Sequence, residues 1–275
     1  MKGHEQFSDF ELARRLERTE GSANASFVEA RATVDPERGA EWIEVAGTYA
    51  MYDGGDSPLT QTFGLGMFEA ASDSILEELE TFFEERDAPA FHEVSPLAGN
   101  PVLILLSDRG YRPFEATSVM FRAVDLPLAT PAKESTPTVA AHTIAAHEWK
   151  LWGEIAGRGW KNEVQGIEDF FLDYSRTAAK ARGFHAFIAE KDGEAIAAGG
   201  LNINQGIALL AGAATVPEAR RQGAQFALLD ARLKFAKEKG CDLAMMCAAP
   251  GSSSQRNAER HGFRIAYTRL KWMRR

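Results

Sequence analysis

The chain has 275 residues, of which 45% are apolar and 25% are charged, and its formal net charge is −8. This length suits two domains of ordinary size, and the composition is that of a folded globular protein. The first residues lack the apolar core of a signal peptide. The longest weakly apolar stretch, residues 207–216, is far too short to cross a bilayer. We therefore expect a cytoplasmic protein with no membrane partner.

The charge is divided unevenly along the chain. Residues 1–125 carry 10 Lys/Arg and 24 Asp/Glu, a net charge of −14, whereas residues 126–275 carry 21 and 15, a net charge of +6. A basic half suits a polyanionic cofactor. The acidic half argues against nucleic acid as a partner and would attract a cationic amine, unless it serves only to keep the chain in solution.

Cysteine usage agrees with a reducing compartment. On one extended strand, Cys241 and Cys247 would lie about 20 Å apart, which is too far for a disulfide. Two reduced thiols are typical of the cytosol. No cluster of His and Cys has metal-ligand spacing, so no metal is expected.

In chain order, the first predicted elements are strands at residues 41–52 and 59–68, which meet at an Asp-Gly-Gly turn. A helix is predicted at residues 71–85, where Ser72 or Asp73 can cap the N-terminus. Three prolines within residues 126–137 predict a linker. The expected domains are therefore residues 1–125 and 138–275.

The second half repeats this order. Strands are predicted at residues 195–204 and 206–214, a helix at 224–239, and strands at 243–247 and 265–273. Residues 110–122 also match residues 262–274 without a gap, in a shared pattern of Gly, an aromatic residue, Arg and then a strand. The two halves are therefore expected to be built alike.

The stretch from Thr215 to Gln225 is the most informative in the chain. A strand, an arginine-and-glycine turn and a helix in this order present unpaired N–H groups and a partial positive charge to an anion. Gly223 permits close approach of the backbone, and Arg220 and Arg221 add charges suited to phosphate oxygens. The stretch has neither the Walker pattern nor the dinucleotide fingerprint. The alternative is an ordinary helix start with surface arginines.

The corresponding stretch of the first half, residues 67–74, has no such turn. Glu69 and Asp73 would repel a diphosphate. We therefore expect the first half to keep the fold and to lack the anion site.

A second segment follows the predicted strand at residues 243–247 and runs from Ala249 to Gly262-Phe263. Together with the turn, it resembles the acetyl-CoA-binding core of the GNAT superfamily of N-acetyltransferases. The pyrophosphate turn of that family reads Arg/Gln-x-x-Gly-x-Gly/Ala. Arg220 and Gly223 match this pattern, and Gln225 replaces its second small residue. The resemblance covers roughly residues 140–275.

The resemblance implies an α/β (α+β) fold of two tandem GNAT-like domains, each with a mixed, mostly antiparallel sheet flanked by helices, the first of them degenerate. It implies acetyl-CoA as cosubstrate, bound by the second domain. In the family the pantetheine arm pairs with an exposed strand edge whose amide groups polarise the thioester. The implied cofactor-binding residues are Ala214, Thr215, Val216, Arg220, Arg221, Gln222, Gly223, Ala224, Gln225, Ser254 and Asn257.

The acid and base of the family are not found at their usual places. Residues 207–215 contain no Asp or Glu, and Ala258 stands where many members have a tyrosine. Tyr267 is the candidate catalytic acid. Structural roles explain Cys247, His261 and Glu154 more simply. In the region expected to cover the acceptor, which includes Trp152 and Asn162, Trp160 is the candidate substrate-binding residue.

These observations favour an acyltransferase that moves an acetyl group from acetyl-CoA to a small amine by direct attack. A non-catalytic acyl-CoA sensor and an aminoacyl or peptidyl transferase that uses a charged tRNA are the alternatives. The acceptor, the acyl length and the oligomeric state are not encoded in any motif of the sequence.

Overall fold

The computed structural model describes residues 8–128, 139–161 and 166–274. The chain forms two compact units. The first comprises Met1–Phe121, Cys247–Glu259 and Phe263–Arg275, and the second comprises Arg122–Met246 and Arg260–Gly262. The sequence predicts two domains that are each continuous in the chain, residues 1–125 and 138–275, and these boundaries stay a prediction. Most of the expected linker lies outside the described residues.

The first unit contains a sheet whose strand order is β1-β2-β3-β4-β11-β5. Its strands are β1 (Glu41–Val45), β2 (Thr48–Tyr52), β3 (Gln61–Phe63), β4 (Phe91–Val94), β5 (Tyr111–Ala123) and β11 (Arg264–Arg274). Its helices are α1 (Phe10–Val34), α2 (Asp73–Glu84), α3 (Asn100–Asp108) and α7 (Ser253–Arg260), with short 3-10 helices at Pro36–Arg38 and Pro96–Ala98.

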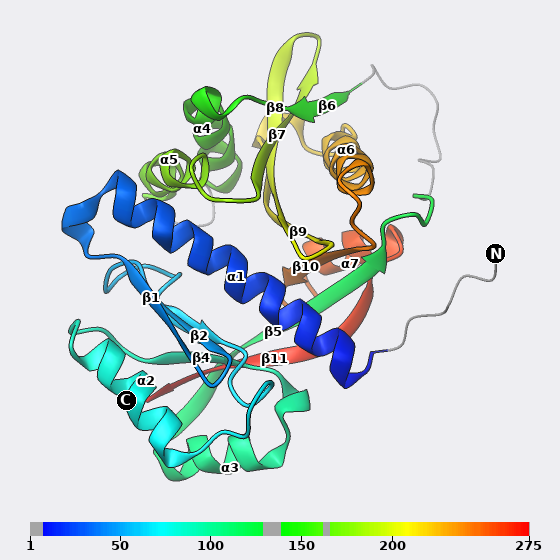
Figure 1. The fold of residues 1–275 in the computed structure, drawn as a ribbon. Coiled ribbons are helices and arrows are strands. Elements are labelled where there is room, and N and C mark those ends of the chain that lie inside the picture. Colours follow the sequence, from blue (N-terminus) through cyan, green and yellow to red (C-terminus); the bar gives the residue numbers. More distant parts are fainter. Residues whose placement is uncertain (1–7, 129–138, 162–165, 275) are drawn as a thin grey trace. The chain divides into compact units, whose positions relative to one another are not determined.

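The last strand of the chain lies inside this sheet. Strand β11 pairs antiparallel with β4 and with β5, in a register that places Arg269 opposite Thr117 and Arg274 opposite Tyr111. The two segments that match each other in sequence, residues 110–122 and 262–274, are therefore neighbouring strands (Figure 1). The sheet of the first unit is thus completed by the C-terminus of the chain.

Helix α1 was not expected from the sequence. Asp9 caps its start by accepting a hydrogen bond of 2.8 Å from Leu12 N. Its inner side packs on one face of the sheet through Ala25 and Val28, which lie in a cluster with Phe63. Helices α2 and α3 contribute Leu79 and Leu106 to a separate core cluster, which also contains Val94 of β4 and Trp272 of β11.

Two predicted strands of the first half differ from the structure. Residues 41–52 form two strands rather than one, because Ala46 and Gly47 take positive φ angles of 51° and 78° and make a turn. The strand expected at 59–68 is only the short β3. Helix α2 agrees with its prediction, and Ser72 caps it by accepting from Ile75 N.

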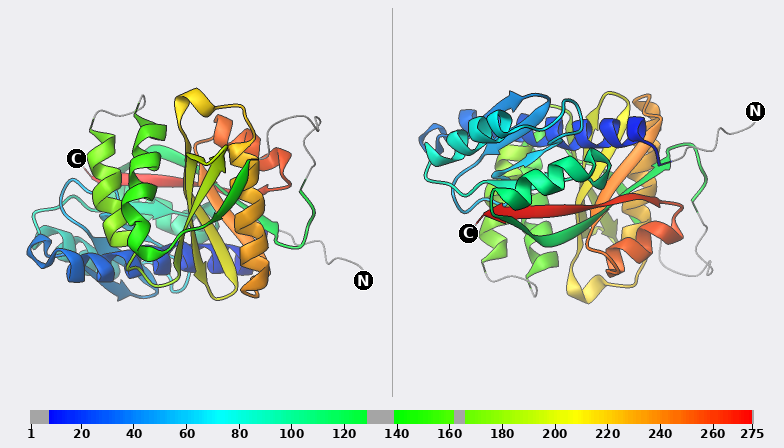
Figure 2. Two further views of the ribbon diagram at one scale, coloured as in Figure 1. Left: turned by 90° about the horizontal axis from the view of Figure 1, so that it is seen from above. Right: turned by 90° about the horizontal axis from the view of Figure 1, so that it is seen from below.

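The second unit contains a sheet with the strand order β10-β9-β8-β7-β6. The strands are β6 (Ala140–Thr143), β7 (Phe184–Lys191), β8 (Glu194–Asn204), β9 (Ile207–Thr215) and β10 (Leu243–Ala248). The helices are α4 (Trp149–Trp160), α5 (Ile167–Ala178) and α6 (Ala224–Glu238), with 3-10 helices at Ala146–Glu148 and Pro217–Ala219. Helices α4 and α5 lie on one face of this sheet and α6 lies on the other (Figure 2).

The expected fold class is confirmed: the chain has a mixed α/β fold with mostly antiparallel strands flanked by helices. Within the described ranges, no helix is long and apolar enough to span a membrane. The same ranges hold no group of three His, Cys, Asp or Glu residues that could bind a metal ion. Both cysteines are free thiols.

A buried histidine in the first unit predicts a pH dependence of stability. His92 is 0% exposed, and its Nδ1 lies 2.9 Å from Thr62 Oγ1. Burial, with a smaller contribution from Arg274, lowers the pKa of His92 from 6.5 to about 4. The unfolded chain therefore binds the proton more readily, so stability is lost as the pH falls from about 6.5 towards 4.

Between pH 7 and pH 5, His92 should lower the free energy of unfolding by about 2 kcal/mol. Urea denaturation at the two pH values should show this loss, and the variant His92→Gln should lack that part of it. The exposed His147→Gln variant is the matched control. Equal pH dependence of the wild-type chain and His92→Gln would contradict the prediction.

Candidate functional site

Strand β9 has an open edge. It pairs in parallel with β10 only at Ile207–Leu243, Ala208–Ala244 and Leu209–Met245. Its remaining residues, 210–215, continue to pair with β8 on the other side. The N–H and C=O groups of this part of β9 that point away from β8 are therefore available to an extended ligand, which could add to the strand as a further strand would.

A bulge lies in the middle of this open segment. Ala198 pairs with Ala214 and Gly200 pairs with Ala211, so Gly212 and Ala213 both lie opposite one residue of β8. Gly212 has a φ of +63°, which favours glycine. A bulge leaves the extra residue out of the ladder, so the pairing with β8 is interrupted at Gly212 and Ala213.

The side chain of Trp152 packs behind the bulge. Its indole Nε1 donates to Gly199 O at 3.0 Å, and a Cβ built on Gly212 would lie 3.6 Å from its ring. Trp152 is 1% exposed. This contact holds the position of the bulge from the side of α4.

The turn between β9 and α6 has the geometry of an anion site. Arg221 and Gly223 take left-handed φ angles of 61° and 92°, and alternation of this kind gathers successive N–H groups into a concavity. Gly223 is the N-cap of α6, and no described side chain caps the helix there. A Cβ on Gly223 would meet nothing within 4 Å. The first amides of α6 are thus open to a ligand.

The guanidinium of Arg220 is fastened beside this turn. Its Nη2 donates to Gly159 O at 3.0 Å, and its Nε reaches Thr215 O at 3.5 Å. Arg220 therefore links the end of α4 and the end of β9 to the turn. Arg221 is exposed to solvent.

The glutamines of the turn are also tied down. Gln225 Nε2 donates to Thr215 Oγ1 at 2.8 Å, so this side chain lies against the end of β9. Gln222 Nε2 donates to Glu218 O, and Gln222 Oε1 accepts from Lys191 Nζ at 2.6 Å. Because these side chains are held in hydrogen bonds within the protein, the backbone amides are the groups of the turn that can face a ligand.

The structure adds two cations that the sequence did not single out. Lys191, at the end of β7, reaches the turn through Gln222. Arg158, on α4, pairs with Glu218 at 2.6 Å. Neither lies near the turn in the sequence, and no motif would have found them. Lys191 adds positive charge beside the turn, whereas the charge of Arg158 is offset by Glu218.

Trp160 lies at the end of α4, close to the open strand. Its neighbour Gly159 packs against β9 so closely that a Cβ there would lie 2.5 Å from Ala214 Cβ. The Trp160 ring stacks on Phe171 with a centroid distance of 6.4 Å, and its buried Nε1 has no partner among the described residues. Trp160 therefore offers an unused donor. Asn162 lies outside the described residues.

Ser254 and Asn257 lie on α7, which belongs to the first unit, whereas the turn belongs to the second. Ser254 is exposed and Asn257 is half-buried. Their expected role as coenzyme contacts stays a prediction.

Tyr267 also lies in the first unit, on β11. It is buried, and its hydroxyl donates to Glu17 Oε1 at 2.7 Å. Burial and the Glu17 carboxylate raise the pKa of Tyr267 well above its usual range. A hydroxyl in this setting releases its proton less readily than an exposed tyrosine.

The other side chains considered for chemistry are held in structural contacts. Burial and the adjacent Glu20 raise the pKa of the Cys247 thiol well above its usual range, which makes it a poor nucleophile. The His261 ring packs on Phe226 at 5.4 Å. Glu154 is half exposed and lies 3.8 Å from Lys150 one helical turn away.

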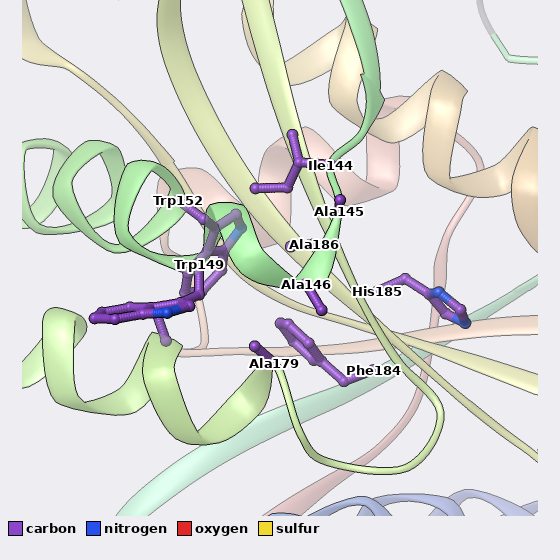
Figure 3. Close-up of a pocket in the computed structure, with 10 residues that line it drawn as sticks. Ile144, Ala145, Ala146, Trp149, Trp152, Ala179, Phe184, His185 and Ala186 are labelled. Atoms are coloured by element: carbon purple, nitrogen blue, oxygen red, sulfur yellow. The ribbon is translucent and has the colours of Figure 1, made fainter.

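A cavity of about 140 Å³ lies under α4 and α5 in the second unit. Trp149, Trp152 and Phe184 line it together with small residues, and Ser175 and His185 also contribute to its lining (Figure 3). The imidazole of His185 turns away from it, towards Phe235 at 4.6 Å. The cavity combines aromatic side chains with alanines, and Trp152 in its lining also contacts the bulge at Gly212.

Residues 143–263 match the family model of the acetyltransferase (GNAT) family. This segment contains the open strand, the bulge and the turn. No curated protein sequence matches the chain.

Several solved structures share the fold. A GCN5-related N-acetyltransferase from Kribbella flavida aligns with a TM-score of 0.61 and 17% identity, over 91% of this chain and 95% of its own. A GCN5-related N-acetyltransferase from Sphaerobacter thermophilus gives 0.57 and 15%, over 86% and 75%. A tandem GNAT protein from the clavulanic acid biosynthesis pathway gives 0.56 and 14%, over 82% and 77%.

At these identities the solved structures establish likeness of fold over most of the chain, whereas the family match covers the part that carries the site. The open strand, the bulge and the helix-terminal turn therefore lie in a segment that matches the GNAT acetyltransferases, within a fold that GNAT proteins share.

Proposed function

We propose that the chain is an N-acetyltransferase that transfers an acetyl group from acetyl-CoA to a small amine. The second unit binds the coenzyme, and the amine attacks the thioester directly. The observation that carries the proposal is the conjunction of the open β9 edge with the uncapped start of α6 at Gly223. The open edge of β9 suits an extended chain that contains amide groups, and the start of α6 suits a diphosphate.

The proposed contacts follow from this geometry. The diphosphate lies against the backbone amides of residues 221–225, with the charges of Arg220, Arg221 and Lys191 around it. The pantetheine arm pairs with Ala214 and the residues on either side of it. Ser254 and Asn257 are proposed as further contacts to the coenzyme. Acetyl rather than a longer acyl group, and a cytoplasmic location, are part of the proposal.

The bulge supplies the proposed electrostatic catalysis. A thioester carbonyl gains negative charge as the amine adds to it, and a fixed amide donor stabilises this oxyanion. Gly212 and Ala213 are the residues whose amides the bulge takes out of the β8 ladder. The tetrahedral intermediate then collapses, the C–S bond breaks, and the CoA thiolate takes up a proton. The amine nitrogen releases its proton to a base.

The leaving thiolate needs a proton donor. Tyr267 is our candidate among the side chains, although its hydroxyl already donates to Glu17. A CoA thiolate is a good leaving group, so water can also protonate it. The absence of Asp and Glu from residues 207–215 favours a base reached through water.

We propose that the first unit does not bind coenzyme. In the stretch that follows β3, Phe68 fills the space beside Gly47 and Gly64, where a Cβ would lie 2.4 Å and 2.9 Å from Phe68 atoms. Arg18 covers its ring at 4.4 Å. A diphosphate would have to displace this side chain and would meet the exposed Glu69.

A non-catalytic acyl-CoA sensor is the second candidate, because neither the strand carboxylate nor the tyrosine that would stand at Ala258 is present. The two functions differ in turnover. The enzyme releases CoA thiol steadily when acetyl-CoA is mixed with a panel of amines, amino acids and aminoglycosides, and the sensor releases none with any of them. A charged tRNA as donor requires tRNA binding at low salt, which the net charge of the first half disfavours.

Gly223→Ala should abolish coenzyme binding. The substitution strains the left-handed φ of +92° and places a methyl group where the diphosphate approaches. We expect the increase in melting temperature caused by acetyl-CoA to disappear, with Kd raised at least about tenfold, or about 1.4 kcal/mol. Gly240→Ala is the matched control, because Gly240 has a φ of +79°, open space around it, and the opposite end of α6 beside it. An undiminished shift in Gly223→Ala would show that the turn is misassigned.

The full chain should bind one coenzyme. Calorimetric titration with CoA should give one site per chain, and the turn variant should give none. The expression of residues 1–125 alone would be a poor test, because β11 is part of the sheet of the first unit. Two sites, or one that survives Gly223→Ala, would contradict the assignment of the first unit.

Trp160→Phe should affect the acceptor rather than the coenzyme. The change keeps the stack on Phe171 and removes the unpartnered indole N–H. We expect KM for the best amine of the panel to rise several-fold while KM for acetyl-CoA changes less than twofold, since one hydrogen bond is worth about 1 kcal/mol. Trp149→Phe, at the other end of α4, is the control. Equal changes in the two KM values would remove Trp160 from the acceptor site.

A further inference from the structure

Four acidic or phenolic side chains of the first unit gather on one arginine. Arg269 Nε donates to Glu93 Oε2 at 2.8 Å, and its Nη1 lies 2.9 Å from Glu20 Oε2 and 3.3 Å from Glu17 Oε1. The fourth is Tyr267, whose hydroxyl donates to Glu17 Oε1. We call Glu17, Glu20, Glu93, Tyr267 and Arg269 the carboxylate cluster. The cluster joins α1, β4 and β11.

The cluster has more acceptors than donors. Glu17 is 0% exposed at its side chain, and its Oε2 has no hydrogen-bond partner within the described ranges. Gln61 Oε1 is a second buried acceptor without a partner there. Gln61 lies two residues before Phe63 on β3, hence on the same face of the sheet, and Arg269 covers the Phe63 ring at 4.8 Å. A buried acceptor left unpaired costs about 1–3 kcal/mol, so a ligand that brings donors is favoured here.

The carboxyl groups of the cluster also outnumber its guanidinium group. Three carboxylates face the Arg269 guanidinium, and Lys271, which stands opposite Glu93 in the sheet, adds a smaller attraction for Glu93. The side chains of Arg269, Glu17 and Glu93 are 2%, 0% and 8% exposed. Burial raises the pKa of Glu17 and of Glu93, so their ionised forms are disfavoured unless a positive charge lies beside them. One additional cation would allow the carboxylates to ionise together.

The cluster also reaches the surface. The Glu20 side chain is 13% exposed, and Cys247, whose Sγ lies 3.3 Å from Glu20 Oε2, is half-buried. A small group can therefore approach Glu20 from solvent, with Glu17 deeper in the unit. A bare doubly charged metal ion is disfavoured, because the guanidinium already occupies the centre of the carboxylates.

We propose that the carboxylate cluster binds a primary ammonium group, with Glu17 and Glu20 as its hydrogen-bond acceptors. An alkylammonium carries three N–H donors and no acceptor, which matches a site whose unused atoms are oxygens. The inference extends the proposed function by giving the first unit a binding role of its own. It requires no coenzyme, so it can fail or hold independently of acetyl transfer.

The test uses the full chain without coenzyme and propylammonium chloride as the probe. Melting temperature is measured as the probe rises to 100 mM, against tetramethylammonium chloride and sodium chloride at equal ionic strength. Propylammonium should raise the melting temperature saturably, by a few degrees, and the other two salts should not, because neither offers N–H donors. No rise, or an equal rise with tetramethylammonium, would overturn the proposal.

Two variants separate binding from stability. Glu17→Gln keeps the shape of a protonated Glu17 and should remove most of the propylammonium shift. Glu80→Gln is the matched control, since Glu80 is another buried carboxylate of the first unit and is held by Arg109 at 2.7 Å and by Tyr111 at 3.0 Å. It should lower the starting melting temperature and leave the shift intact. If Glu17→Gln keeps the full shift, or Glu80→Gln loses it equally, the ammonium does not bind at the cluster; Glu20→Gln repeats the test should Glu17→Gln fail to fold.

Discussion

The second unit is organised around a parallel pairing that stops early. Strands β9 and β10 pair over three residues each, and β9 then continues for six more with one edge unpaired. An open edge inside a sheet is costly unless a ligand or water completes it. The bulge at Gly212, the packing of Gly159 and the position of the α6 N-terminus all depend on where this edge begins. The proposed chemistry is a consequence of this single interruption.

The elements that could be predicted from the sequence are those with local signals. Helix α6 was expected at residues 224–239 and runs from Ala224 to Glu238, because its buried residues repeat at helical spacing and Gly223 and Gly240 flank it. The hairpin of β8 and β9 was also expected from a local signal, because Gly206, which has a positive φ, supports its tight turn. The turn at residues 220–225 was recognised from a short pattern, and its backbone geometry suits an anion.

Helix α1 is hard to predict, because charged residues and a glycine interrupt its otherwise apolar buried side. Glu17 and Arg31 are 1% and 2% exposed within it, and Gly21 lies in its middle. The glycine is needed there because a Cβ would come within 2.7 Å of the Tyr49 ring. Each of these residues weakens the periodic signal on which helix prediction depends. Lys191 could not be connected with the turn from the sequence, because its contact with Gln222 joins residues 31 positions apart.

The place of β11 also has a consequence for how the protein is made. A ribosome synthesises most of the first unit first, yet the strand that lies between β4 and β5 emerges after all the strands of the second unit. Until then β4 and β5 lack the partner that joins them, and their edges are exposed to other nascent chains. The first unit therefore cannot take its final form until β11 has been synthesised, after the strands of the second unit.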